Sequence, residues 1–376
     1  MVRRDWFWDR DAGAANDRSH RKMLSPVLRK GERRENGLVK DLPSWIRRLI
    51  TIPAVVLLWI VALGLSPLLF PVALVVDAVR AARGIPATAW RMLAYLITYL
   101  TAEVGALAAC LFMWIGSGFG LMKPLLVAWT YRLQLIWANL LWGAAKVIFR
   151  LRMSVTGADL ASPGPLVVLS RHASIVDNIL PFQLFTRHRR IWLRYVLKRE
   201  LLVDPSLDIA GNWLPNYFVD RGGSDSDREL ESLRRLTRDL KSNEGVVIFP
   251  EGTRFTADKQ KRSFEILRRR NPRFFEMSRG LRHVLPPRPG GALAIIEAAA
   301  ADVVMVAHHG LDGFANIANI WAGGMVGKHV QVLLSRHRYE DIPTGRTART
   351  EWLFKLWQEM DDWLAQLGPV TVAADG

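Results

Sequence analysis

The fold is decided by GPLVVLSRHASIVDNILP, residues 164–181. Its apolar run, Leu166 to Leu169, predicts a buried β-strand, and Ala173 to Leu180 predicts a helix that follows at once. His172 would then lie at a strand-to-helix turn. Because Asp177 follows five residues later, its carboxylate could hold one ring nitrogen of His172 and leave the other to accept a proton. A capping His and a surface Asp are the plain alternative, since this spacing often occurs by chance.

Beyond Leu151, short strands alternate with helices. The predicted strands are Leu166–Leu169, Ile191–Leu197, Tyr217–Val219, Val246–Phe249, Val303–Ala307 and Val330–Leu334. Leucines 230, 233, 236 and 240 form the apolar stripe of one helix, and Arg349 to Leu367 predicts a last amphipathic helix. This alternation indicates an α/β fold with a mostly parallel central sheet flanked by helices, which binds ligands where its strands end.

Two long apolar runs precede this domain, Leu49–Val76 and Met92–Phe119. Each is long enough to cross a hydrocarbon core of about 30 Å, which needs about 20 residues. Pro53, Pro67 and Pro71 interrupt the first run, so it is either a span or a re-entrant hairpin with the prolines at its tip. The number of spans stays open.

The predicted organisation has four parts. Residues 1–48 are a basic, largely disordered arm, and residues 49–120 are membrane-embedded helices. Residues 121–150 are apolar but carry charges and three tryptophans, which favours an amphipathic helix in the membrane interface. Residues 151–376 are the α/β domain.

Composition indicates an anionic partner, because the formal net charge is +16. The 15 tryptophans favour a membrane surface over nucleic acid, since tryptophan prefers the headgroup layer. Cys110 is the single cysteine, which excludes an intrachain disulfide.

Three further stretches place cations where predicted strands end. Phe218 to Gly223 contains Arg221, Phe249 to Arg254 reads FPEGTR, and Lys198 closes another strand. Guanidinium groups, a hydroxyl and bare glycine backbone suit a phosphate monoester. The candidate binding residues are Lys198, Arg221, Glu251, Gly252, Thr253 and Arg254. Each stretch alone could be an ion pair or a solvated turn, but together they describe a His base among phosphate-holding cations.

These motifs resemble those of the glycerophospholipid acyltransferase family, typified by 1-acylglycerol-3-phosphate acyltransferases. His172 to Asp177 matches the first family motif, Arg221 the second and FPEGTR the third. Leu281 to Gly291 resembles a region of the branch with larger lysophospholipid acyltransferases. The fourth motif, usually Val-Pro, departs to Val306-Ala307-His308-His309, which puts the acceptor and donor preference in doubt.

The resemblance implies a membrane-bound enzyme that moves a fatty acyl group from acyl-CoA or acyl carrier protein to a lysophospholipid hydroxyl. The first candidate acceptor is 1-acylglycerol-3-phosphate, which gives phosphatidic acid. His172 would be the base steadied by Asp177, and Arg221, Arg254 and Lys198 would hold the acceptor phosphate. Gly252 would allow backbone approach, and Glu251 would orient an arginine or the acceptor. No metal or other cofactor is implied, and the catalytic domain is expected on the cytoplasmic side.

Alternatives remain at this stage. A lipid or thioester hydrolase could use the same pair to activate water, another lysophospholipid or glycerol 3-phosphate could be the acceptor, and a catalytically silent scaffold is a third reading. The basic tract Lys259–Arg279 either contacts anionic groups or is solvated. Arg171 either binds phosphate or is solvated, and His308 and His309 are assigned structural roles because the sequence shows no clear acid partner for them.

Overall fold

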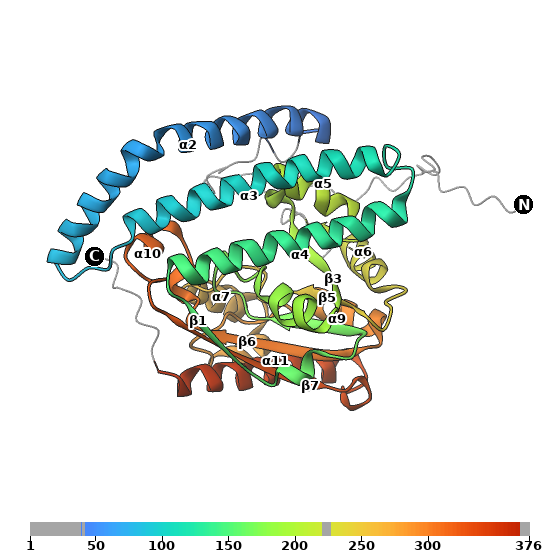
Figure 1. The fold of residues 1–376 in the computed structure, drawn as a ribbon. Coiled ribbons are helices and arrows are strands. Elements are labelled where there is room, and N and C mark those ends of the chain that lie inside the picture. The colour runs from blue at the N-terminus through green and yellow to red at the C-terminus, as the bar shows by residue number, and fades with distance from the viewer. Residues whose placement is uncertain (1–38, 40–41, 220–226, 369–376) are drawn as a thin grey trace, which may run out of the picture. The chain divides into compact units, whose positions relative to one another are not determined.

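The α/β domain is built around seven β-strands. They are β1 (Arg152–Thr156), β2 (Leu166–Ser170), β3 (Trp192–Lys198), β4 (Tyr217–Val219), β5 (Glu244–Ile248), β6 (Asp302–His309) and β7 (His329–His337). They form one sheet in the order β1-β7-β6-β2-β5-β3-β4 (Figure 1). Neighbouring strands are parallel except for the antiparallel pair β6 and β7. The predicted α/β fold with a mostly parallel sheet is therefore confirmed.

The structure, a computed structural model, describes Val39, residues 42–219 and residues 227–368. Most of the predicted N-terminal arm and Arg221 lie outside these residues. Residues 44–48, which the sequence analysis assigned to the arm, form the first turn of a helix instead.

Helices cover both faces of the sheet. The α-helices are α2 (Ser44–Ala82), α3 (Ala89–Gly116), α4 (Lys123–Ile148), α5 (Pro205–Trp213), α6 (Asp227–Thr237), α7 (Ala257–Arg270), α8 (Pro272–Ser278), α9 (Pro289–Ala299), α10 (Ile317–Trp321) and α11 (Arg346–Gln366). Short 3-10 turns are η1 (Ala158–Ala161), η3 (Arg199–Val203), η4 (Asp312–Phe314) and η5 (Tyr339–Asp341), and η2 (Phe182–Arg187) is a π-helix.

Strand β2 is the middle strand of the sheet and is packed between two hydrophobic layers. All five of its residues are buried, and successive side chains point to opposite faces. Leu166 and Val168 join the core under α4, whereas Val167 and Leu169 join the core formed with α6, α9 and α11. A strand buried on both faces explains the uninterrupted apolar run in the sequence. By contrast, β1 is an edge strand that alternates exposed and half-buried residues, which explains why its weak pattern was not predicted.

The segment after β2 differs from the prediction. A helix was expected from Ala173, but the chain forms turns through Ile179 and becomes helical only from Leu180. The backbone N–H groups of Ala173 and Ser174 donate to the Asp177 carboxylate, at 2.6 and 2.7 Å. This local bonding satisfies the backbone in a turn, so the helix begins later.

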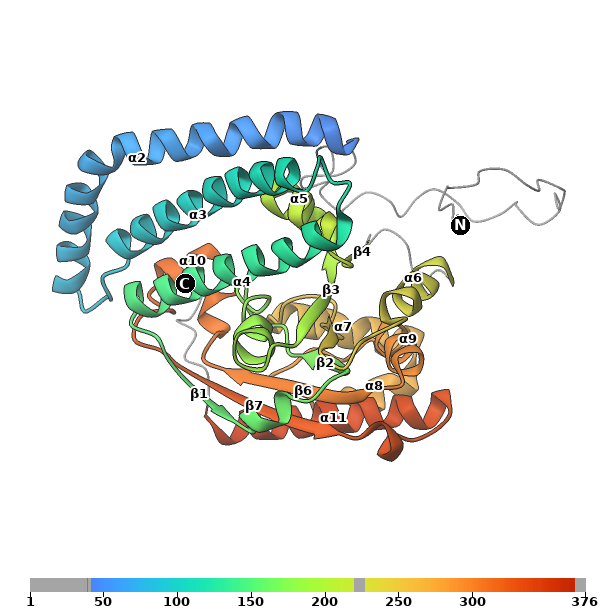
Figure 2. The same cartoon turned by 45° about the vertical axis from the view of Figure 1, so that its right-hand side comes forward.

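Helix α2 is one continuous helix of 39 residues, so the re-entrant hairpin alternative is wrong. Pro53, Pro67 and Pro71 lie inside it, and it bends rather than reverses (Figure 2). Proline removes backbone hydrogen bonds inside a helix, which accounts for such a bend. Among the described helices, α2 and α3 are long and apolar enough to cross a membrane. Many large apolar side chains of α2 are exposed, among them Leu57, Leu65, Leu68, Val72 and Val75.

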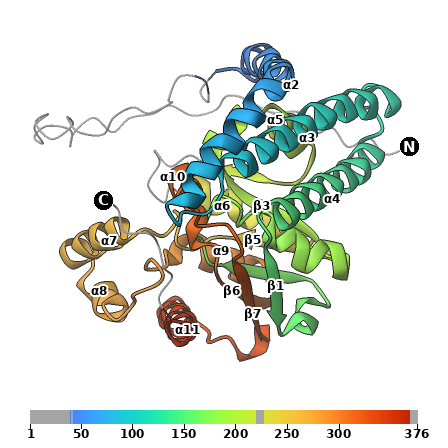
Figure 3. The same cartoon turned by 60° about the vertical axis from the view of Figure 1, so that its left-hand side comes forward.

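Both ends of α2 are tied to the α/β domain. Near its start, Arg47 forms a buried ion pair with Asp208 of α5, 2.6 Å apart. Near its end, Arg80 donates to the backbone carbonyl of Trp321 in α10, at 2.6 Å. Figure 3 shows α2 running from the neighbourhood of α5 to that of α10.

Helix α4, predicted to be interfacial, covers one face of the sheet. Ala138, Trp142 and Ala145 are buried against the strands, whereas Ile136 and Val147 on the other side are exposed. The domain therefore accounts for one apolar face of α4, and the interfacial position of its exposed face stays a prediction.

Candidate active site

His172 and Asp177 lie together at the end of β2. The Nδ1 atom of His172 is 3.0 Å from Oδ2 of Asp177, and both side chains are buried. The ring of Phe249 packs against the imidazole with ring centroids 4.7 Å apart. A carboxylate on Nδ1 fixes the proton there and leaves Nε2 as the basic nitrogen.

The Asp177 carboxylate is fixed by several donors. Besides His172, it accepts hydrogen bonds from the N–H groups of Ala173 and Ser174 and from the Ser174 hydroxyl. Burial alone would raise the pKa of Asp177, but interactions with His308, His172 and Ser174 outweigh it and hold this pKa at about 2. The carboxylate is therefore ionised at neutral pH and cannot turn away from the imidazole without losing these bonds.

The surroundings of His172 lower the pKa of its imidazole, which favours the neutral, basic form. Burial lowers the pKa of the imidazole, the charges of Lys198 and Arg254 lower it further, and Asp177 opposes both. A neutral imidazole at pH 7 can remove a proton from a hydroxyl, and the imidazolium that forms is stabilised by Asp177.

Glu251, the acid of FPEGTR, holds backbone rather than an arginine. Its two carboxyl oxygens accept from the N–H groups of His172, at 2.8 Å, and of Leu285, at 2.9 Å. Burial raises the pKa of Glu251 to about 8 despite these two bonds. The sequence analysis expected Glu251 to orient an arginine or the acceptor. These two hydrogen bonds instead join the loop that contains His172 to the segment before α9.

The turn that follows Glu251 brings two cations to the site. Gly252 has a left-handed backbone, φ +68°, and a Cβ atom there would lie 3.3 Å from the Arg288 side chain. The N–H of Gly252 donates to the Phe249 carbonyl at 2.9 Å, so this donor is used within the turn. Arg254 donates to the carbonyl of Ala315 at 2.8 Å. Thr253, between Gly252 and Arg254 in the sequence, is partly exposed.

Lys198 is the last residue of β3, and His172 follows the carboxyl end of β2, which runs in the same direction, so both lie at the same end of the strands. Lys198 and Arg254 are both close enough to lower the pKa of His172. The structure thus brings together His172, Asp177, Lys198 and the FPEGTR turn, whereas Arg221 lies outside the described residues. Arg288 is the cation that sequence reasoning did not select, although it stands in the quoted segment Leu281–Gly291.

Residues 152–308, which contain all of these groups, match the sequence profile of the family described as Acyltransferase. Residues 152–308 therefore form an acyltransferase domain, and the curated relatives support the resemblance to the glycerophospholipid acyltransferase family. Among curated relatives, lysocardiolipin acyltransferase 1 of Gallus gallus is 23% identical over 66% of this chain and 70% of its own length. The gamma 1-acyl-sn-glycerol-3-phosphate acyltransferase of Mus musculus is 29% identical over 52% of this chain. The chain spans about half the length of that relative, 51%.

A solved structure is also similar. It is the 1-acyl-sn-glycerophosphate acyltransferase of Thermotoga maritima, with 14% identity and a TM-score of 0.37 over 71% of this chain and 98% of that chain.

Arg171 is not solvated and its guanidinium is not available to phosphate, so both sequence alternatives are wrong. It is 1% exposed and forms a bidentate ion pair with Asp312, at 2.6 and 3.2 Å. It also donates to the carbonyls of His308 and His283. Asp312 is distant in sequence, which is why the partner was not predicted.

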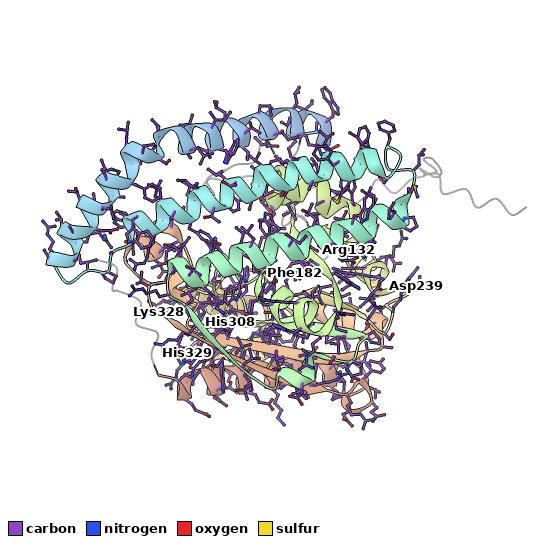
Figure 4. The ribbon with its side chains drawn as sticks, in the orientation of Figure 1. Arg132, Phe182, Asp239, His308, Lys328 and His329 are labelled. Atoms are coloured by element: carbon purple, nitrogen blue, oxygen red, sulfur yellow. The ribbon has the colours of Figure 1, made fainter. Side chains whose placement is uncertain are left out.

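His308 has an acid partner that the sequence analysis did not find. Its Nε2 atom lies 3.4 Å from Oδ1 of Asp177 and 3.2 Å from the carbonyl oxygen of Arg171. The side chain is fully buried at the end of β6, and Figure 4 marks its place inside the domain. The parallel pairing of β2 with β6 makes this contact, which no sequence spacing indicates.

Within the described residues, no group of three or more His, Cys, Asp or Glu side chains could hold a metal ion.

Proposed function

We propose that this acyltransferase moves a fatty acyl group from a thioester, acyl-CoA or acyl carrier protein, to the free hydroxyl of a lysophospholipid, with 1-acylglycerol-3-phosphate as the first candidate. The single observation that carries the proposal is the buried His172–Asp177 pair beside cations suited to a phosphate. The relatives named above support a lysophospholipid acceptor by their own names.

In the proposed step, Nε2 of His172 removes the hydroxyl proton while that oxygen attacks the thioester carbonyl carbon. The new C–O bond replaces the C–S bond, and the imidazolium returns its proton to the departing thiolate. The thioester is already activated, so the main contribution of the protein is the base, roughly 10²- to 10⁴-fold in rate.

Arg254 and Arg288, with Lys198 and Arg221, would hold the acceptor phosphate. Arg254 is partly buried and fixed by the Ala315 carbonyl, which leaves further guanidinium N–H groups to donate. Anchoring the phosphate would position the glycerol hydroxyl over His172, an orientational contribution to the rate.

We propose in addition that α2 lies along the bilayer surface and does not cross it. Arg47 and Arg80, near its two ends, both bond to the same α/β domain, which cannot lie on both sides of a membrane. At about 1.5 Å per residue, α2 is also about 58 Å long, well beyond the hydrocarbon thickness. The α/β domain would face the cytoplasm, where the acyl donor is made.

The test is product analysis with the full chain in anionic vesicles, supplied with acyl-CoA or acyl carrier protein and a panel of lysophospholipids. We expect diacyl product, lost by at least about 10²-fold in His172→Ala. His188→Ala, which replaces an exposed histidine, is the matched control and should keep wild-type activity. Free fatty acid as the sole product would show a hydrolase and would overturn the proposal.

A further inference from the structure

Helix α10 presents two apolar side chains on one exposed face. Ile317 and Trp321 are four residues apart, so they lie on the same side of the helix, and they are 70% and 43% exposed. Large apolar side chains exposed together mark a surface that meets an apolar partner.

The segment that leads into α10 is bonded directly to the active site. The carbonyl of Ala315 accepts from Arg254, and the carbonyl of Phe314 accepts from the N–H of Ile175 at 3.2 Å. Ile175 belongs to the loop between His172 and Asp177, and its side chain is also exposed, at 46%. We call Ile175, Ile317 and Trp321 the apolar lip.

The other end of α10 is bonded to the turn between α2 and α3. Arg80 and Thr88 both donate to the Trp321 carbonyl, and the Arg80 guanidinium lies 4.6 Å from the centre of the Trp321 ring. The contact is close, because a Cβ atom on Gly323 would come within 2.8 Å of Pro86. Figures 1 to 3 all show α10 beside this turn and α11 on the far side of the domain.

Exposed apolar side chains, such as Val75 and Val79, also lie on α2, the helix whose Arg80 contacts Trp321 of the apolar lip. Trp321 beneath Arg80 has the composition of a headgroup-layer anchor, with an aromatic body and a cation above it. Ile317 has no polar atom and suits the acyl layer beneath.

We propose that the apolar lip inserts into the acyl layer of the bilayer at the mouth of the active site, so that a lysolipid reaches His172 with its chain still in the membrane. This inference rests on the membrane attachment in the proposed function. The apolar lip contacts the bilayer and not a partner protein. The reason is that α10 is bonded to the α2–α3 turn and to the loop from His172 to Asp177, and both of these carry exposed apolar side chains.

The direct test labels Ile317→Cys in a Cys110→Ala background with an environment-sensitive nitrobenzoxadiazole dye. The full chain is bound to vesicles of phosphatidylcholine and phosphatidylglycerol. The matched control is Thr347→Cys, an exposed position at the start of α11. We expect a blue shift and quenching by doxyl-labelled lipids at position 317 and neither effect at position 347.

Co-sedimentation separates the two proposals. Vesicle binding without quenching at position 317 overturns the lip and leaves membrane attachment standing. If the wild-type protein does not bind vesicles, both the apolar lip and the membrane attachment are overturned. Sedimentation and acyl transfer are measured on the same preparations.

Kinetics give a second readout. With Ile317→Ser, we expect kcat/KM for a long-chain acceptor in vesicles to fall about tenfold, in line with loss of one buried apolar side chain. For a short-chain, water-soluble acceptor, kcat/KM should stay unchanged, and Ile317→Leu should match the wild type with both. An equal loss with both acceptors would overturn the proposal.

Discussion

The Nε2 atom of His308 lies 3.4 Å from Oδ1 of Asp177, the carboxylate whose other oxygen holds the ring of His172. Burial lowers the pKa of His308, so its imidazole is neutral near pH 7, and the acceptor 3.2 Å from its Nε2 atom is the Arg171 carbonyl. One carboxylate thus joins two histidines, one from the loop after β2 and one from β6.

We expect His308→Leu to lower kcat about tenfold, about 1.4 kcal/mol, because it removes the polar imidazole that lies 3.4 Å from the Asp177 carboxylate. KM should change little, because His308 would act through Asp177 and not through the cations that would hold the acceptor phosphate. His308→Gln keeps an N–H donor near the position of Nε2 and should stay within about threefold of the wild type. Equal losses in both variants, at equal thermal stability, would contradict the role.

The pH profile should show His172 as a base. Its active form is neutral, and burial together with Lys198 and Arg254 lowers its pKa from 6.5. We therefore expect kcat/KM to be flat at neutral pH and to fall on the acid side with a midpoint below 6.5. Asp177→Asn removes the group that raises this pKa, so the midpoint should move lower while kcat falls by up to about 10⁴-fold. A midpoint above 6.5 in the wild type would refute the assignment.

Breaking the Arg171–Asp312 pair should destabilise the domain. Asp312→Ala leaves the guanidinium of Arg171, which is 1% exposed, without its counter-charge, and we expect unfolding free energy to fall by about 3–5 kcal/mol. The control is Arg273→Ala, which breaks an exposed pair with Glu351 and should cost less than about 1 kcal/mol. Denaturant unfolding in detergent measures both, and similar values would contradict the buried-pair argument.

Arg288 should contribute to acceptor binding and not to the chemical step. Arg288→Ala is expected to raise KM for a lysophospholipid about tenfold, since a hydrogen bond to a charged group contributes about 1.5–3 kcal/mol. kcat should change less than threefold. Arg282→Ala, which removes another exposed arginine of the same segment, serves as the control and should leave KM unchanged. If kcat falls and KM does not rise, Arg288 does not act in acceptor binding.

Short-range features of the sequence predicted much of the fold. The six predicted strands are all present, each within about two residues of its expected start, because buried apolar runs such as Leu166–Leu169 are local signals. The approach of Asp177 to His172 was predicted for the same reason, since five residues of chain limit how far apart they can lie. The helix expected at Ala173 failed because a side chain, Asp177, bonded the backbone that a helix would have used.

What the sequence by itself determined is the α/β class, the acid–base pair and the motifs that carry the family, since all of these lie in short, contiguous stretches. Tertiary structure alone decided the partners of Arg171, Glu251 and His308 and the two anchors of α2. Those contacts join residues far apart along the chain. The partners of Arg171, Glu251 and His308 meet where parallel strands end at the same side of the sheet, and the anchors of α2 meet where helices pack together; local patterns carry no information about which distant side chain will arrive there.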